Sequence, residues 1–288
     1  MTVFQGILLG ILQGVAEFLP ISSSGHLAVA QNLFELGEVP LLFDVFLHLA
    51  TLLAVCLYFW RKIVRLFCVL GRWIARRAQP ESTLNLADSL AGTDKAGRRT
   101  IIAVIITTAI TAVLGIITSK KIPELSIKAT CAGFLVTAVL LIVSNLRRQR
   151  NEKLAAVTPD ANEPKGISIF QSVVIGIMQG FGTLPGISRS GSTIAGALYS
   201  GVDAKSAGDY SFIVSIPAIL GAFILELKDL GEVTSTIGAA PVIAGCAAAF
   251  AVGYISLTFL MKVIRRGKLH WFAAYLIPAG ILGLLFLH

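Results

Sequence analysis

Continuous apolar stretches of about 20 residues recur along this chain, and they constrain its fold more than any other feature. A helix of roughly that length crosses the hydrocarbon core of a bilayer. The mean hydropathy is +0.81, and only 14% of the residues are charged. Strands of a membrane barrel would alternate over about ten residues instead of forming continuous runs. The pattern therefore predicts an all-α polytopic membrane protein, with six full spans near residues 42–60, 100–119, 127–146, 208–226, 239–262 and 271–287.

Two further apolar segments, residues 3–34 and 168–201, are interrupted midway by Pro, Gly and Ser clusters. Shifted by 166 residues, they match: Gly10-Ile11-Leu12-Gln13-Gly14 falls on Gly176-Ile177-Met178-Gln179-Gly180, and Ile21-Ser22-Ser23-Ser24-Gly25 falls on Ile187-Ser188-Arg189-Ser190-Gly191. This is an internal duplication. Both copies carry small residues at four-residue spacing, which lets helices approach closely.

The distribution of charge predicts how the chain lies in the membrane. Nine lysines and arginines occur between residues 61 and 99, whereas residues 1–60 contain none. Basic residues favour the cytoplasmic side, so we expect residues 61–99 inside and the chain start outside. Membrane topology thus explains the net charge of +8. We expect anionic lipid headgroups, and no nucleic acid, as partners of the basic residues. Residues 77–99 are expected to form a solvated loop.

The predicted organisation is a single integral membrane domain, residues 1–288, built from two repeat halves. The halves cover approximately residues 1–146 and 168–288, and a cytoplasmic loop at 147–167 joins them. Three full spans separate the two interrupted segments, so the halves have inverted topology. We interpret both segments as re-entrant, broken-helix hairpins, because irregular backbone at membrane depth requires a protein or water-filled surrounding. Inverted repeats of this kind place their sites where the two loops meet.

The first interrupted segment contains groups that could bind metal or react. Glu17 lies one helical turn after Gln13, and a carboxylate at membrane depth indicates function by default. Oxygen ligands from this pair and from phosphate would suit a divalent cation; alternatively, Glu17 reaches the headgroups. Ser22, Ser23 and His26 follow in one loop, where histidine could activate a serine hydroxyl, although such serines are also common helix caps.

The second segment supplies an anion site. Arg189 aligns with Ser23, and its guanidinium geometry matches phosphate oxygens. The flanking residues Ser188, Ser190, Gly191 and Thr193 would add hydroxyl groups and free N–H groups at the start of a helix. The alternative is a purely structural ion pair between Arg189 and Glu17.

Asp44 and His48, four residues apart in the first span, are further candidates for lining the pocket, and a structural pair is the other interpretation. Taken together, the candidates describe an intramembrane site for a phosphorylated lipid. Phosphoryl transfer needs mainly positioning and neutralisation of charge.

These motifs carry a resemblance that covers essentially the whole chain. Gln13-x-x-x-Glu17, Pro20-x-Ser22-Ser23-x-Gly25-His26 and Pro185-Gly186-x-Ser188-Arg189-Ser190-Gly191-x-Thr193 resemble the undecaprenyl-diphosphate phosphatase family, also called bacitracin resistance proteins. The resemblance implies a bacterial inner-membrane enzyme that hydrolyses undecaprenyl diphosphate at a periplasmic site and so recycles the lipid carrier for peptidoglycan.

The resemblance also implies roles for individual residues. Ser23 matches the candidate nucleophile, His26 the general acid/base and Arg189 the phosphate clamp, while Gln13 and Glu17 match a motif associated with Mg²⁺ or Ca²⁺. The first motif position is Gln here where the family also has Glu, and a neutral amide is a weaker cation ligand. Whether Ser23 or His26 attacks stays open, and Ser22 is a further phosphate-binding candidate.

The competing interpretation is a lipid-phosphate transporter or flippase, because transporters are also built from inverted repeats with broken helices. A transporter requires an anion site but no nucleophile with a base. The combination of serine, histidine and arginine therefore favours the phosphatase. A homodimer is a further candidate partnership.

Overall fold

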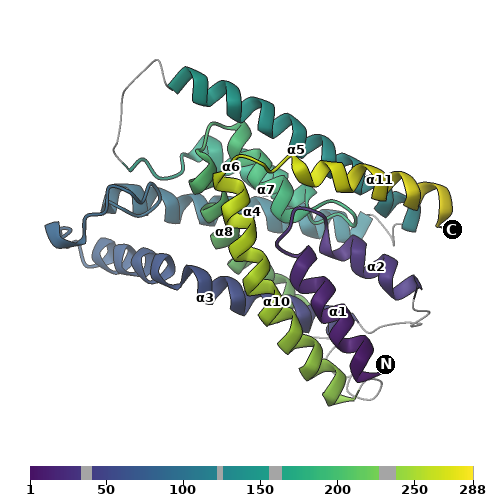
Figure 1. The fold of residues 1–288 in the computed structure, drawn as a ribbon. Helices are drawn as coiled ribbons and strands as arrows, with labels where there is room; N and C mark the ends of the chain where they lie inside the picture. Colours follow the sequence, from purple (N-terminus) through teal and green to yellow (C-terminus); the bar gives the residue numbers. More distant parts are fainter. Residues whose placement is uncertain (34–40, 122–125, 156–163, 227–237, 288) are drawn as a thin grey trace.

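The computed structural model describes residues 1–33, 41–121, 126–155, 164–226 and 238–287, and these residues contain helices and no strand. Figure 1 shows the helices as one bundle in which the short α7 lies near the centre. In chain order they are α1 (Val3–Ala16), α2 (Ser23–Leu33), α3 (Leu41–Ile74), the 3₁₀ turn η1 (Glu81–Thr83), α4 (Asp94–Lys121), α5 (Ile127–Ala155), α6 (Ile169–Phe181), α7 (Arg189–Tyr199), α8 (Ala204–Glu226), α10 (Ala239–Arg265) and α11 (Trp271–Phe286).

Five helices are long and apolar enough to cross a membrane, namely α3, α4, α5, α8 and α10. This confirms a polytopic, all-helical membrane protein. The sixth expected span, residues 271–287, forms α11, which has only 16 residues. Two helices run past their expected ends: α3 continues from residue 60 to Ile74, and α5 continues to Ala155, into the expected loop at 147–167. Residues 156–163 of that loop lie outside the described residues.

Each interrupted segment forms two short helices joined by a turn. With 14 and 13 residues, α1 and α6 are about 21 Å and 20 Å long, too short for a hydrocarbon core of about 30 Å. Both begin with a capping box, formed by Thr2 with Gln5 and by Ser168 with Gln171, positions that the 166-residue shift superimposes. The same shift superimposes the first residues of α2 and α7. The duplicated sequence thus forms the same local structure twice.

The short helices pack reciprocally on the opposite half of the chain. The most extensive contacts join α1 to α10, α6 to α4 and α5 to α11, and Figure 1 shows α1 along α10 and α5 beside α11. Glycines make the first contact close: a Cβ on Gly10 would lie 2.9 Å from the Gly245 Cα, and one on Gly14 would lie 2.8 Å from the Gly253 nitrogen. On the other side, Gly176 faces Ile110 of α4.

The segment between α3 and α4 packs against the helices, unlike the solvated loop expected at residues 77–99. Asp88, Leu90 and Ala91 are buried. The Asp88 carboxylate pairs with Arg65 at 2.7 Å and with Lys62 at 3.4 Å, and Lys62 also pairs with Asp209 of α8. Ion pairs explain the difference, because they allow a charged segment to be buried.

The pKa of the Asp88 carboxyl reflects these partners. Burial acts to raise this pKa, but Lys62, the backbone N–H groups of Ala91 and Leu90, and Arg65 together lower it below its usual range. A lowered pKa in the folded state stabilises the fold above the pKa of the unfolded chain, and this contribution is lost as the pH falls through the folded-state value. The contacts of Asp88 therefore hold the segment in place at neutral pH.

The close contact of α1 with α10 yields a stability prediction. We expect Gly10→Ala to lower the free energy of unfolding by about 1–3 kcal/mol, because the new methyl group would meet the backbone of α10, which cannot move aside as a side chain can. Thermal unfolding in detergent micelles measures this change. The matched control is Gly71→Ala on α3, where a Cβ has open space within 4 Å and stability should stay equal or rise. Equal behaviour of the two variants would contradict the packing argument.

Candidate active site

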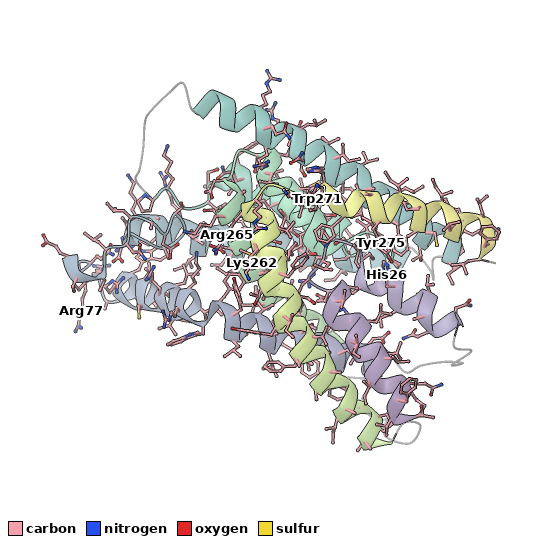
Figure 2. All side chains as sticks on the ribbon, in the orientation of Figure 1. His26, Arg77, Lys262, Arg265, Trp271 and Tyr275 are labelled. Atoms are coloured by element: carbon pink, nitrogen blue, oxygen red, sulfur yellow. The ribbon has the colours of Figure 1, made fainter. Side chains whose placement is uncertain are left out.

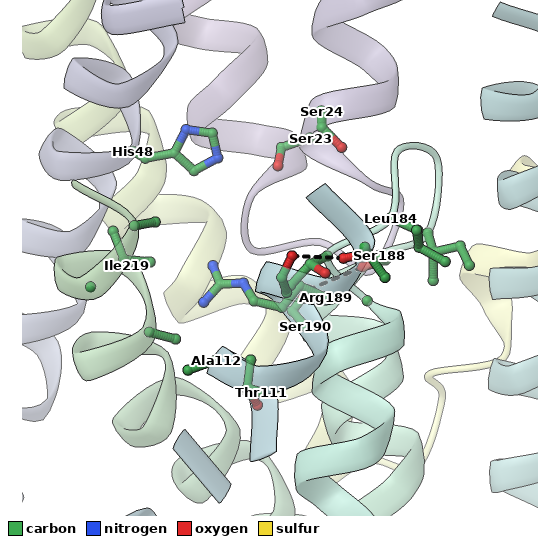
Figure 3. Close-up of a pocket in the computed structure, with 18 of the residues that line it drawn as sticks. Ser23, Ser24, His48, Thr111, Ala112, Leu184, Ser188, Arg189, Ser190 and Ile219 are labelled. Carbon is green, nitrogen blue, oxygen red and sulfur yellow. Dashed lines mark hydrogen bonds between the residues drawn. The ribbon is translucent and has the colours of Figure 1, made fainter. Parts of the chain in front are cut away.

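A cavity of about 810 Å³ lies where the two broken helices meet. The α1–α2 turn, the α6–α7 turn, α3, α4 and α8 all contribute to its wall. The two turns are in direct contact, since the Ser190 Oγ donates to the Phe18 carbonyl oxygen at 3.2 Å. Figure 3 shows Ser23, Ser24 and His48 across the cavity from Ser188, Arg189 and Ser190. The Ser/Gly loops that the sequence placed together therefore do form one site.

Glu17 is the centre of the polar cluster in this cavity and is 6% exposed. Its Oε2 accepts from the Ser23 Oγ at 2.7 Å and from the Gln13 Nε2 at 3.2 Å. The His48 Nε2 lies 3.4 Å from the same oxygen. The other carboxylate oxygen of Glu17, Oε1, is paired with the Arg189 guanidinium. The carboxylate thus connects the expected nucleophile of one hairpin to the expected phosphate clamp of the other.

One nitrogen of the Arg189 guanidinium makes no hydrogen bond in the described structure. Its Nη2 is used by Glu17, whereas its Nη1 is buried and has no hydrogen-bond partner within the described structure. A buried donor without a partner is unfavourable, and an anion in the cavity would satisfy it. Arg189 and Ser23 are also the first residues of α7 and α2, so the positive ends of two helix dipoles meet at this cavity. These features favour a bound anion.

The hydroxyl groups beside Arg189 mainly shape the start of α7. The Ser188 Oγ accepts from the Gly191 N–H at 3.0 Å and lies 3.3 Å from the Ser190 Oγ, and both serines line the cavity. The Thr193 Oγ1 donates to the Arg189 carbonyl oxygen at 2.6 Å, away from the cavity lining. Of these candidates, Ser188 and Ser190 are placed to reach a phosphate, whereas Gly191 and Thr193 position the helix.

Ser22, the residue before the expected nucleophile, has a left-handed backbone conformation with φ of 73°. Its counterpart in the second hairpin, Ser188, has a φ of −74°. This conformation costs a non-glycine residue roughly 1 kcal/mol or more and persists only where the surroundings enforce it. Ser22 is buried, and its Oγ accepts from the Gly25 N–H at 3.4 Å. Ser22 therefore caps α2 and sets the direction of its first turn.

His26 does not lie in the cavity, which differs from the expected pairing with Ser23. Its Nδ1 lies 2.8 Å from the Ser22 carbonyl oxygen and its Nε2 lies 2.7 Å from the Tyr275 hydroxyl oxygen. The ring stacks on Tyr275 of α11 with the centroids 5.7 Å apart, as Figure 2 shows the two side by side, and it lies tilted against Phe134 of α5 at 4.8 Å. The partners of each side chain explain the difference: the Ser22 carbonyl oxygen and the Tyr275 hydroxyl hold the His26 ring, whereas the Ser23 Oγ donates to Glu17. The group that accepts from the Ser23 hydroxyl in the described structure is the Glu17 carboxylate.

Of the predicted pair Asp44 and His48, only His48 is placed in the cavity wall. His48 lines the cavity, whereas the Asp44 carboxylate turns aside and accepts from the Gln31 Nε2 at 3.1 Å. The His48 Nδ1 lies 2.7 Å from the Asp44 backbone oxygen. Thr108 and Thr111 of α4 also line the cavity, and neither was predicted from the sequence. Single threonines inside an apolar span carry no signal that would distinguish them from packing residues.

The polar cluster offers a divalent cation few protein ligands. The Gln13 Oε1 is buried without a hydrogen-bond partner, so one oxygen is free for a cation. Gln13 is fully buried and does not line the cavity, however, and Glu17 already balances Arg189. The described residues contain no group of three or more His, Cys, Asp or Glu placed to hold a metal. A cation would fit here only if phosphate oxygens completed its coordination.

The fold and the site define a class of protein: a helical membrane protein in which two broken helices meet at a cavity lined by an arginine and a serine–carboxylate pair. The model of the family described as bacitracin resistance protein BacA matches residues 6–282. The chain belongs to this family.

Three relatives are similar to this chain over almost the full length of both sequences. A protein from Treponema denticola named undecaprenyl-diphosphatase is 43% identical over 98% of this chain and 96% of its own length. A second from Desulforapulum autotrophicum, with the same name, is 35% identical over 99% and 98% of the two chains, and a third from Methanobrevibacter smithii is 35% identical over 98% and 96%. These names favour a phosphatase over the transporter interpretation.

The pair of Glu17 and Arg189 generates a prediction about stability. Glu17→Gln leaves the partly buried guanidinium without a counter-charge and should lower the free energy of unfolding by about 3 kcal/mol. Adding Arg189→Gln should recover at least half of this loss, because no unpaired charge then remains. Thermal unfolding in detergent measures both variants. Asp44→Asn, a similar change at a carboxylate with no guanidinium partner in the described structure, should cost about 1 kcal/mol or less. Additive losses in the double variant would contradict an ion pair.

Proposed function

We propose that this protein hydrolyses undecaprenyl diphosphate to undecaprenyl phosphate and inorganic phosphate. The observation that carries the proposal is the contact of the Ser23 Oγ with Glu17 at 2.7 Å, beside Arg189, in a cavity inside the membrane domain. The residues that we propose as nucleophile, base and anion clamp lie within this one cluster. The names and near-complete coverage of the relatives support this substrate.

The geometry supports a reaction in two steps. Arg189, through its free Nη1, and the first turns of α2 and α7 bind the terminal phosphate and neutralise charge in the transition state. The Ser23 Oγ attacks the terminal phosphorus as its proton passes to Glu17; the new Oγ–P bond forms while the bond from phosphorus to the bridging oxygen breaks. Undecaprenyl phosphate departs. Glu17 passes its proton to the departing undecaprenyl phosphate. Water then attacks the phosphoserine and gives a proton to Glu17, which delivers it to the Ser23 Oγ as the Oγ–P bond breaks and inorganic phosphate leaves.

We further propose that the protein lies in the bacterial inner membrane with the cavity facing the periplasm. The absence of Lys and Arg from residues 1–60 and their abundance in residues 61–99 support this orientation. In this location, hydrolysis would recycle the lipid carrier for peptidoglycan synthesis and lower the amount of diphosphate that bacitracin can bind. A homodimer stays a prediction.

Release of inorganic phosphate from undecaprenyl diphosphate by the detergent-purified protein tests the proposed reaction. We expect Ser23→Ala and Arg189→Ala each to reduce kcat/KM by at least about 10³-fold, because one removes the nucleophile and the other the charge that stabilises the transition state. Ser24→Ala removes a neighbouring hydroxyl of the cavity that does not contact Glu17, and it should stay within about threefold of wild type. Full activity of Ser23→Ala would exclude the serine mechanism.

We propose in addition that a divalent cation, Mg²⁺ or Ca²⁺, assists this reaction. Glu17, the free Gln13 Oε1 and phosphate oxygens would hold it, and the cation would supply further neutralisation of the diphosphate. The free Gln13 oxygen supports this proposal, although Gln13 does not line the cavity.

A gain of charge at Gln13 tests the cation directly. Gln13→Glu should lower the cation concentration for half-maximal activity about tenfold, because a carboxylate binds a hard cation more strongly than an amide. Gln179→Glu is the matched control, since Gln179 is the repeat counterpart of Gln13 and has a buried Oε1 without a partner but no neighbouring Glu17. Activity that EDTA leaves unchanged in the wild type would refute the cation.

A further inference from the structure

The cavity changes character along its length. Its inner end carries Glu17, Ser23 and Arg189, whereas its outer end is lined by apolar residues of two helices, including Ala112 and Ile116 of α4 and Ala222 and Leu225 of α8. Figure 3 shows Ala112 and Ile219 on the side of Arg189 that faces α4 and α8. A phosphate would bind at the first end, because the second end is mostly apolar and its Thr118 hydroxyl donates to the Gly115 carbonyl oxygen at 2.9 Å.

The helices α4 and α8 are tied together at one level and separated at another. The Thr107 Oγ1 and the Tyr210 hydroxyl lie 2.9 Å apart, and both side chains are fully buried. The cavity-lining residues follow C-terminally on both helices: Gly115 lies about 12 Å of helix beyond Thr107, and Gly221 about 16 Å beyond Tyr210. The two helices therefore run in the same direction from their tie and enclose the cavity between them.

Pro217 lies in α8 between the tie and the opening, and it lines the cavity. A proline within a helix removes one backbone hydrogen bond and bends the helix. Pro217 lies at the level where the cavity separates α8 from α4. The separation of the two helices thus has a cause in the sequence.

The opening between these helices leads to the lipid-facing surface. Ile116 is 45% exposed and Leu225 is 56% exposed, and the two residues belong to the candidate membrane spans Asp94–Thr118 and Ala204–Leu225. Gly115 and Gly221 lie on the facing walls, and a Cβ on either would meet no atom within 4 Å. Side chains at these two positions would therefore project into the passage rather than into packed protein.

From these observations we infer that the prenyl chain of the substrate leaves the active site sideways between α4 and α8, through a passage that Gly115 and Gly221 keep open. The inference rests on the proposed function, because it assigns the hydrocarbon part of that substrate. A cavity of about 810 Å³ accommodates a headgroup and the adjoining part of a chain. The remainder of the chain stays in the bilayer, so the lipid need not be extracted from it.

Blocking the passage should separate long substrates from short ones. Gly115→Phe and Gly221→Phe should each reduce hydrolysis of undecaprenyl diphosphate by at least about tenfold, because the ring occupies the path of the chain. Hydrolysis of dimethylallyl diphosphate, which has a single prenyl unit, should stay within about twofold of wild type. Gly71→Phe on α3 is the matched control, since its Cβ also has open space but lies outside the cavity lining. Equal loss on both substrates, or no loss on either, would overturn the passage.

A measurement that needs no turnover locates the chain independently. Undecaprenyl phosphate with a photoreactive diazirine on its first prenyl units is bound to the wild-type protein, and adducts are mapped by mass spectrometry. We expect adducts on residues 112–118 and 218–225; adducts confined to α5, α10 or α11 would overturn the inference. If adducts lie on α4 and α8 but no phosphate is ever released, the proposed hydrolysis fails while the passage stands. If phosphate is released and the adducts lie elsewhere, only the passage fails.

Discussion

The ion pair of Glu17 with Arg189 joins two turns that are 172 positions apart in the chain, at a depth where neither charge could remain alone. Because the charges must meet, the α1–α2 and α6–α7 turns must also meet, and the close contacts around them follow. The Ser190 bond to the Phe18 carbonyl and the packing of Gly191 on Pro20 both lie beside the pair. Irregular backbone inside the membrane is thereby covered by protein, as the surrounding lipid requires.

Duplication provides this site with two equivalent frames that carry different chemistry. The first residue of α2 is Ser23 and the first residue of α7 is Arg189, so corresponding positions present a hydroxyl group and a guanidinium to the same cavity. Glu17 corresponds to Thr183, which carries no charge. The repeated backbone brings two helix N-termini together, and the differences between the copies make the site asymmetric. An asymmetric site can bind a phosphate on one side and attack it from the other.

Much of this arrangement could be predicted from the sequence, because its signals are local. Apolar runs predict spans, and the repeated Gly/Ser motifs predict two broken helices with a shared site at Glu17, Ser23 and Arg189. The position of His26 could not be predicted in this way, since it depends on which face of α2 packs against Phe134 and Tyr275. The contribution of Thr108, Thr111 and Pro217 was also hidden, because it arises only from the way α4 and α8 pack around the turns.

The burial of the segment at Asp88 was missed for a related reason. Its composition is that of a solvated loop, and only the pairing with Lys62 and Arg65, more than 20 positions earlier, makes burial favourable. Sequence patterns describe what one element needs. They do not describe which distant partner meets that need.

The exchange of short helices between the halves has a consequence for biosynthesis. The helix α1 emerges first from the ribosome, yet its glycine face packs on α10. Because α1 ends at Ala16 and α10 begins at Ala239, 223 positions separate them. At translation rates of about 5–20 residues per second, α1 would wait roughly 10–45 s for its partner. During that interval a helix too short to cross the membrane has no groove to occupy. Until nearly the whole protein has been made, α1 must therefore stay at the membrane surface or stay bound to the insertion machinery.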